Sequence, residues 1–272
     1  MMRALWTAAS GMKAQQTSLD TISNNLANIN TNGYKKERVE FQSLLYQNIQ
    51  KKTTDTQGNA KPIGAQVGLG TKVSAIATEF TQGKMLATEG AFDFAIQGKG
   101  FFMVQMPNGT VGYTRNGAFT MAVNGEGGVS LTTADGYQVL DATGKPVSFA
   151  GNIDTTKLTF DEYGRILYPD ANGRMTDTGI KIGAAQFNNP AGLNKLGNSY
   201  YAASLASGEP RLEGQDAALQ LSKIKNKYLE GSGVEAVDEM VDMIVTQRAY
   251  EMNSKAITAS DEMLQQANNL RS

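Results

Sequence analysis

Few residues in this 272-residue chain have the chemistry of an active site. The chain contains no cysteine and no histidine. Without cysteine there is no disulfide, no thiolate nucleophile and no thiolate metal site. Without histidine, the side chain most used for proton transfer near neutral pH and for zinc binding is missing. The composition therefore argues against an enzyme that depends on these groups.

The remaining chemical motifs are weak. Residues 98–100 (Gly-Lys-Gly) resemble a phosphate loop but lack its second Gly-Lys-Ser/Thr element, which favours the start of a strand. Residues 170–173 (Asp-Ala-Asn-Gly) resemble the beginning of a calcium loop without its later glutamate, which favours a turn. Asp161 and Glu162 would point to opposite faces of a strand. The sequence thus predicts no catalytic, metal-binding or cofactor-binding residue.

Charge and hydropathy also limit the classes of partner. The net charge of −1 provides no field that would draw the chain to nucleic acid or to a membrane surface. No stretch has the apolar length of a membrane span, and the first residues lack the apolar core of a signal peptide. We therefore expect no nucleic-acid binding, no membrane insertion and no cleaved signal.

A long amphipathic helix is predicted for residues 234–270, which would be on the order of 55 Å long. Apolar residues recur with a mean step of about 3.6 residues and no break. This stripe comprises Val234, Val237, Val241, Val245, Ala249, Met252, Ala256, Ala259, Met263, Ala267 and Leu270. Ser232 and Glu235 have the spacing of a capping box at its start. Left in water, such a stripe would forgo on the order of 10 kcal/mol of apolar burial, so it needs a partner.

A second amphipathic helix is predicted near the start of the chain. Its seam alternates steps of three and four residues, as in a coiled coil. The seam comprises Leu5, Ala8, Met12, Gln15, Leu19, Ile22, Leu26 and Ile29. Gly11 weakens the helix by about 1 kcal/mol. The two terminal helices are expected to pair with each other. Burial of both in an ordinary globular core remains the alternative.

The chain between the helices has a different character. Residues 47–70 are polar and rich in Thr, Gln and Gly, which predicts a flexible loop or an arm ordered by a partner. From residue 71 the pattern becomes period two. Five Asn-Gly or Asp-Gly pairs, with Gly144 and Gly164 between the last two, divide most of the region at intervals of roughly 8 to 12 residues, as in consecutive β-hairpins. The predicted fold is α+β: a helix at 1–33, an arm at 34–70, an all-β domain at 71–205, a return linker at 206–231 and a helix at 232–272.

Four stretches resemble the rod and hook family of axial proteins of the bacterial flagellum. Residues 23–35 (Ser-Asn-Asn-Leu-Ala-Asn-Ile-Asn-Thr-Asn-Gly-Tyr-Lys) look like its N-terminal motif, and residues 239–253 (Glu-Met-Val-Asp-Met-Ile-Val-Thr-Gln-Arg-Ala-Tyr-Glu-Met-Asn) look like its C-terminal motif. Residues 98–102 and 113–119 are similar to landmarks of its β domain. The chain departs from the family at Gly233, where Asn is usual.

The resemblance implies a structural protein. It implies a helical homopolymer of many subunits in the basal body, outside the cytoplasm, reached by type III export. The arm favours the distal part of the rod, and a proximal rod or hook-type protein is the near alternative. Proximal rod proteins, hook proteins and surrounding rings are the implied neighbours. Phe41 and Leu45 look like the family's export motif, although a helix or strand face explains them equally well. A wall hydrolase that uses carboxylates of the β domain is the alternative from another class.

Overall fold

The computed structural model describes residues 2–50, 64–123, 127–149, 154, 157–170, 174–215 and 219–270. Contacts divide the chain into two compact units. Unit 1 comprises residues 1–27, 37–78 and 235–272, and unit 2 comprises residues 28–36 and 79–234. The five consecutive segments predicted from the sequence remain a prediction, because the two units are defined by contacts and each unit combines segments that are distant in sequence.

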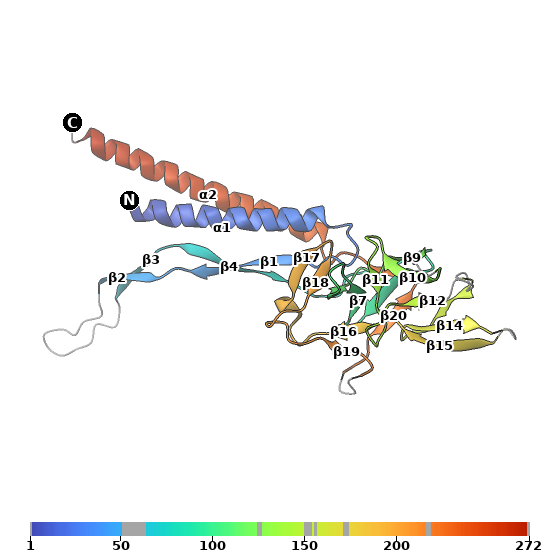
Figure 1. Ribbon diagram of the computed structural model, residues 1–272. Coiled ribbons are helices and arrows are strands. Elements are labelled where there is room, and N and C mark those ends of the chain that lie inside the picture. Colours follow the sequence, from blue (N-terminus) through green and yellow to red (C-terminus); the bar gives the residue numbers. More distant parts are fainter. Residues whose placement is uncertain are drawn as a thin grey trace. The chain divides into compact units, whose positions relative to one another are not determined.

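Two long helices lie against each other in unit 1 (Figure 1). They are α1 (Met2–Ala27) and α2 (Ala236–Asn269). Asn25 bonds to Glu239 near one end of the pair, and Gly11 approaches Asn253 farther along, so the helices run antiparallel. The predicted contact between the terminal helices is confirmed.

The start of α2 differs from the prediction. Glu235 occupies the N-cap and makes no side-chain cap hydrogen bond. Ser232 Oγ instead accepts a hydrogen bond from the Val234 backbone N–H at 3.3 Å. The predicted capping box is therefore wrong. Asp238 and Glu239 lie in the first turn, where negative charge favours the positive end of the helix dipole.

A two-stranded ribbon completes unit 1. β1 (Glu37–Ser43) pairs with β4 (Thr71–Thr78), and β2 (Tyr46–Gln50) pairs with β3 (Ala65–Gly68), both antiparallel. Hydrogen bonds from Leu44 N to Gly70 O and from Leu69 N to Leu45 O connect the two ladders. β1 and β4 also contact α1. The predicted arm thus includes paired strands, and its residues 51–63 lie outside the described part of the chain.

Unit 2 is built from short antiparallel strands. Its strands are β5 (Met85–Ala87), β6 (Phe94–Gln97), β7 (Phe101–Gln105), β8 (Val111–Thr114), β9 (Phe119–Val123), β10 (Val129–Thr133), β11 (Gln138–Val139), β12 (Ser148–Phe149), β13 (Thr159–Phe160), β14 (Arg165–Pro169), β15 (Met175–Lys181), β16 (Ala184–Gln186), β17 (Asn194–Gly197), β18 (Tyr200–Ala202), β19 (Arg211–Leu212), β20 (Lys223–Asn226) and β21 (Tyr228–Glu230). A 3₁₀ turn, η2 (Pro190–Gly192), precedes β17. The predicted β-rich region is confirmed.

The main sheet of unit 2 has the strand order β12-β10-β11-β7-β8-β18-β17. β9 pairs with β10, and β16 pairs with both β7 and β19. β13, β14 and β15 form a separate sheet, while β20 pairs with β6 and β21 with β5. The last two pairings bring the end of unit 2 back to its beginning.

Two apolar clusters form the core of unit 2, and β7 contributes to both. Phe102 and Val104 belong to one cluster, and Phe101 and Met103 belong to the other. Successive side chains of a strand point to opposite faces, so both faces of β7 are covered. Edge-on aromatic contacts join distant strands, such as Phe94 with Phe160 at 4.7 Å between ring centroids.

The hairpin turns predicted at the Asn-Gly and Asp-Gly pairs are only partly confirmed. Gly109 and Gly136 have φ of +73° and +85° and close tight turns, as predicted. Asn116 and Gly117 do not form a hairpin, because β8 pairs with β7 and β18 and not with β9. A Cβ on Gly117 would collide with the Phe94 carbonyl oxygen, so a close approach of two backbones requires this glycine. Residues 124–126 and 171–173 lie outside the described part.

Candidate assembly surface

The faces of α1 and α2 that meet are largely polar or small. On α2 the buried residues are Glu239, Thr246 and Ser260, and Asn253 lies between the last two at the same seven-residue spacing. On α1 they are Ala8, Ala14, Thr21, Ile22 and Asn25. A Cβ on Gly11 would lie 3.0 Å from Asn253 Nδ2, so the glycine permits close contact. The helix pair therefore buries little apolar area within one subunit.

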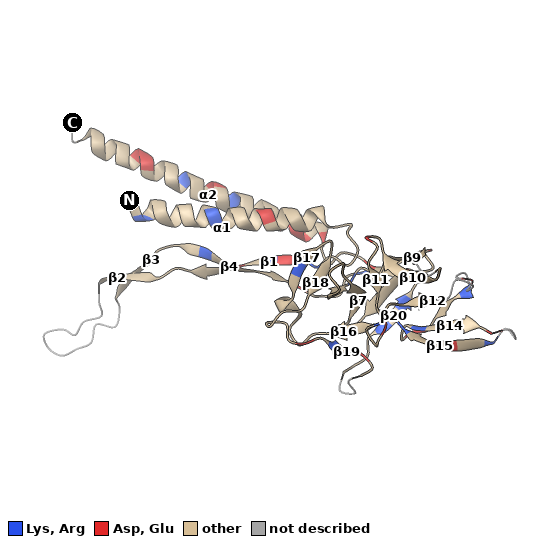
Figure 2. Ribbon diagram, viewed as in Figure 1, with Lys and Arg blue, Asp and Glu red and all other residues tan. Residues whose placement is uncertain are grey.

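The apolar stripe of α2 remains exposed. Val237 is 67% exposed and Met252 is 65% exposed. The other large exposed members of the stripe are Val241, Val245, Met263 and Leu270. α1 does not cover these residues, because it packs against the polar face of α2. Figure 2 shows charged residues of both signs spread along the helices without a patch of one sign.

The remaining predicted assembly residues occupy several environments. Leu5, Met12, Leu19 and Leu26 on α1 are half-buried, and Ile22 is buried. Ile29 lies beyond the end of α1 and Val234 before the start of α2, and both belong to unit 2. The predicted assembly residues are thus divided between the two units, and those of unit 1 range from buried to exposed.

Sequence reasoning missed part of the exposed apolar area. Met240 and Ile244 widen the stripe on α2, and Met2 and Trp6 are exposed near the start of α1. Met240 and Ile244 are four residues apart, so a helical wheel of α2 would have placed them beside the stripe. Trp6, which is 73% exposed, is the single tryptophan of the chain.

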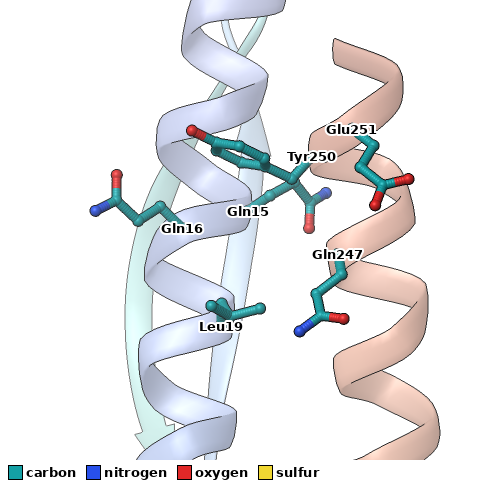
Figure 3. A pocket seen from close by; sticks show the side chains of 6 residues that line it. All are labelled: Gln15, Gln16, Leu19, Gln247, Tyr250 and Glu251. Atoms are coloured by element: carbon teal, nitrogen blue, oxygen red, sulfur yellow. The ribbon is translucent and has the colours of Figure 1, made fainter. Parts of the chain in front are cut away.

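A groove of about 380 Å³ lies between the two helices (Figure 3). It is lined by Gln15, Gln16, Leu19, Gln247, Tyr250 and Glu251. Its lining includes three glutamines and one carboxylate, and Gln15 is the polar residue of the predicted seam. The lining resembles a polar break in a helix interface more than an apolar ligand pocket.

The proposed export residues lie on the ribbon of unit 1. Phe41 is in β1 and Leu45 directly precedes β2, and both are exposed. Their role in export remains a proposal, because a strand position is compatible with either explanation of the motif.

The carboxylate pair does not resemble a catalytic pair. Glu162 forms an ion pair with Lys223 at 3.0 Å, and Asp161 accepts hydrogen bonds within the turn that ends at Gly164. The described residues contain no group of three or more acidic, histidine or cysteine side chains that could hold a metal ion. Among the same residues, no helix has the length and apolar character needed to cross a membrane.

Three family models match separate parts of the chain. The model for flagella basal body rod proteins matches residues 5–35. The model for the D1 domain of flagellar hook proteins FlgE/F/G matches residues 95–168. The model for the C-terminal part of flagellar basal body rod proteins FlgEFG matches residues 225–270. The matched segments are thus both helical ends and the core of the β unit.

Whole-length relatives give the same result. The flagellar basal-body rod protein FlgG of Borreliella burgdorferi is 43% identical over 100% of this chain and 99% of its own length. The FlgG protein of Agrobacterium fabrum is 41% identical over 96% and 97% of the two chains. That of Bacillus subtilis is 37% identical over the full length of both. The chain therefore belongs to the family of the flagellar basal-body rod proteins FlgG.

Proposed function

We propose that this chain is a structural subunit of the distal rod and assembles helically into a rigid, hollow shaft that transmits torque to the hook. The observation that supports this function best is the exposed stripe of α2. Complete burial of one valine or methionine side chain is worth about 1.5–3 kcal/mol, so six such residues offer ample stabilisation to a second copy. Identical copies that bind through different surfaces build open filaments.

The family consists of rod proteins, which polymerise in the basal body. This membership sets aside the alternative of a wall hydrolase. The specific partners are part of the proposal. They are proximal rod proteins at one end, hook proteins at the other, rings around the shaft, and the type III export apparatus during secretion. Family membership places the chain in the rod of the flagellar basal body, outside the cytoplasm. No cofactor is assigned.

Oxidative footprinting tests the assembly surface directly. Met240, Met252 and Met263 are exposed on α2, whereas Met103 is 2% exposed in the core of unit 2. Peroxide should oxidise the three α2 methionines in the free chain to sulfoxides, because oxidation follows exposure. In the polymer they should become protected, and Met103 should resist in both states. Equal oxidation of α2 in the free chain and in the polymer would contradict burial of this face on assembly.

A further inference from the structure

The chain passes between the two units at four places: 27/28, 36/37, 78/79 and 234/235. These covalent connections carry force from one unit to the other. In each unit, a buried polar cluster holds residues next to these crossings. We call them the unit 1 node (Asn25, Glu37 and Glu239) and the unit 2 node (Lys35, Arg115 and Glu230).

Asn25 is the centre of the unit 1 node. Its Nδ2 donates to the Glu37 carbonyl at 2.8 Å and to Glu239 Oε2 at 3.1 Å. Its Oδ1 accepts from the Glu37 backbone N–H at 2.9 Å. Asn25 is 1% exposed and Glu239 is fully buried. One side chain thereby fixes the last turn of α1, the first residue of β1 and the first turn of α2, which adjoin three of the four crossings.

Glu230 is the centre of the unit 2 node. Its Oε1 lies 2.6 Å from Lys35 Nζ and accepts a hydrogen bond from the Gly83 backbone N–H at 2.9 Å. Its Oε2 lies 3.2 Å from Arg115 Nη1. Lys35 Nζ also donates to the Thr81 carbonyl at 2.7 Å. A single carboxylate therefore gathers groups from three distant parts of the chain.

Backbone hydrogen bonds tie the same segments together. Gly33 N donates to Glu230 O at 2.7 Å, and Gly233 N donates to Tyr34 O at 3.0 Å. Glu79 N donates to Lys36 O at 2.8 Å. The segments 33–36, 79–83 and 230–233 are thus bound to one another beside the crossings at 36/37, 78/79 and 234/235.

Burial of the unit 2 node has an electrostatic cost. Burial lowers the pKa of Lys35, and the attraction of Glu230 only partly opposes this effect. Burial likewise lowers the pKa of Arg115. A buried ion pair of this kind often contributes no more stability than apolar residues of the same volume. Its directional bonds do, however, fix the geometry of the groups that they join.

We propose that each node braces, within its own unit, the chain segments through which torque passes to the other unit. We call this pair of braces the joint, with Asn25 and Glu230 as its positioning residues. This inference rests on the proposed function, since a subunit carries torque only as part of a rod. Each node holds the ends of the crossings on its own side at fixed spacings, so a load on that unit is shared among these connections.

Glu213 offers a matched control. It is a buried carboxylate of unit 2, 2% exposed, that binds Ser222 and Gln186. It makes none of the bonds that tie the crossing segments. Glu213 does attract Arg115 electrostatically, but it forms no hydrogen bond with it. Glu213→Gln and Glu230→Gln therefore remove the same charge from the same unit, and only the second removes the bonds of the node.

The first experiment compares amide exchange in full-length free chains. In Glu230→Gln, exchange at Gly33, Glu79, Gly83 and Gly233 should accelerate by about tenfold or more, because these amides lose a shared buried anchor. In Glu213→Gln, the acceleration should concentrate at Gly100 and Ser222. Should Glu230→Gln fail to fold, Glu230→Asp keeps the charge, shortens its reach and should give the same pattern. Equal patterns in the Glu213 and Glu230 variants would overturn the joint.

The second experiment measures strength in assembled basal bodies. Each variant is expressed in cells that lack their own distal rod protein, and isolated basal bodies are sheared and imaged. Rods of Glu230→Gln should break or bend in a larger fraction than rods of Glu213→Gln. Equal fractions of broken or bent rods in the two variants would overturn the joint but not the proposed function, because both variants would still have built rods. Failure of the unchanged chain to build any rod would overturn the proposed function itself, and the joint as a path for torque with it.

Discussion

At the scale of single residues, Gly33 shows how a turn signal can also mark a close approach. It has φ of +69°, and a Cβ there would lie 2.6 Å from the Arg115 carbonyl carbon. Gly109 has a similar φ of +73° but open space around it. Gly33→Ala should lower the free energy of unfolding by about 3 kcal/mol or more, and Gly109→Ala by about 1 kcal/mol.

Urea unfolding of the two alanine variants provides the measurement. Both substitutions impose the same backbone strain, so the difference between them isolates the collision with Arg115. Similar losses of stability in the two proteins would show that the backbone at Gly33 relaxes away from Arg115.

Tyr200 should make unit 2 sensitive to alkali. Burial raises the pKa of Tyr200 above its ordinary value of 10.0, and the hydrogen bond to Asp135 Oδ2 at 2.8 Å adds to this effect. The folded state therefore keeps the phenolic proton while the unfolded chain releases it. Above pH 10 the unfolded state binds fewer protons, and stability falls as the pH rises.

Tyr200→Phe tests this pH dependence. At neutral pH the variant should be less stable by about 1 kcal/mol, because it loses the hydrogen bond to Asp135. Between about pH 8 and pH 11 its stability should decline less than that of the unchanged chain. Tyr163→Phe, at an exposed position, serves as control and should leave the slope unchanged. Parallel slopes for all three proteins would contradict the assignment to Tyr200.

At the scale of elements, the helix pair shows that hydrophobic periodicity predicts the helices themselves but not the faces through which they pack. The sequence predicted both helices because their apolar residues recur over many turns. It did not identify the face of α2 that contacts α1, which consists of Glu239, Thr246, Asn253 and Ser260. A polar contact face leaves no apolar signature. Only the structure shows that the apolar stripe faces away.

The exposed stripe should be necessary for assembly and dispensable for the free chain. Val241 and Val245 are both exposed, so Val241→Glu with Val245→Glu should leave the helix content of the free chain nearly unchanged. In a polymer the same carboxylates would be buried without partners, which costs several kcal/mol for each charge. We expect loss of rods in cells and of filaments in electron micrographs.

Thr258→Glu is the control for added charge, because Thr258 is an exposed polar position of the same helix. It should assemble normally. If the double valine variant also assembles normally, the stripe between Val237 and Val245 does not contribute to the polymer interface.

The β elements were predicted where turns and apolar residues coincide in the sequence. The period-two pattern predicted the β-rich region at 71–205, and strands β4 to β18 lie within these bounds. β1, β2 and β3 were missed, because most of their residues are exposed and no buried face imposes alternation. Lys35, Arg115 and Glu230 were not linked by any local pattern, since Lys35 and Glu230 are 195 residues apart. Contacts of that range are fixed by strand pairing and not by local sequence.

At the scale of the whole molecule, the two units should differ in stability before assembly. Unit 2 has two buried apolar clusters, whereas the contact face of α2 in unit 1 is polar. In the free chain, amides of α1 and α2 should exchange much faster than amides of β7, because local opening exposes little apolar area. Hydrogen exchange followed by mass spectrometry would measure this difference. Uniform protection across both units would contradict folding coupled to assembly.

The arm also has a role that can be tested in the assembled shaft. We expect the segment that begins with β2 and ends with β3 to brace neighbouring subunits and keep the shaft straight. Leu69 N donates to Leu45 O at 3.2 Å, so the ribbon can be closed at this pair. Replacement of residues 46–68 by Asn-Gly would supply the two-residue turn that an antiparallel hairpin favours. β1 and β4 should remain paired, and export of the chain should continue.

Basal bodies built from the shortened chain should contain rods that curve or flex under shear. Circular dichroism of the free chain checks that the fold is retained, and a variant with the same turn inserted after residue 108, within the β7–β8 connection, controls for altered hairpins elsewhere. Straight rods that resist shear as the unchanged ones do would exclude the arm as the stiffening element, and leave rigidity to the helices and the joint.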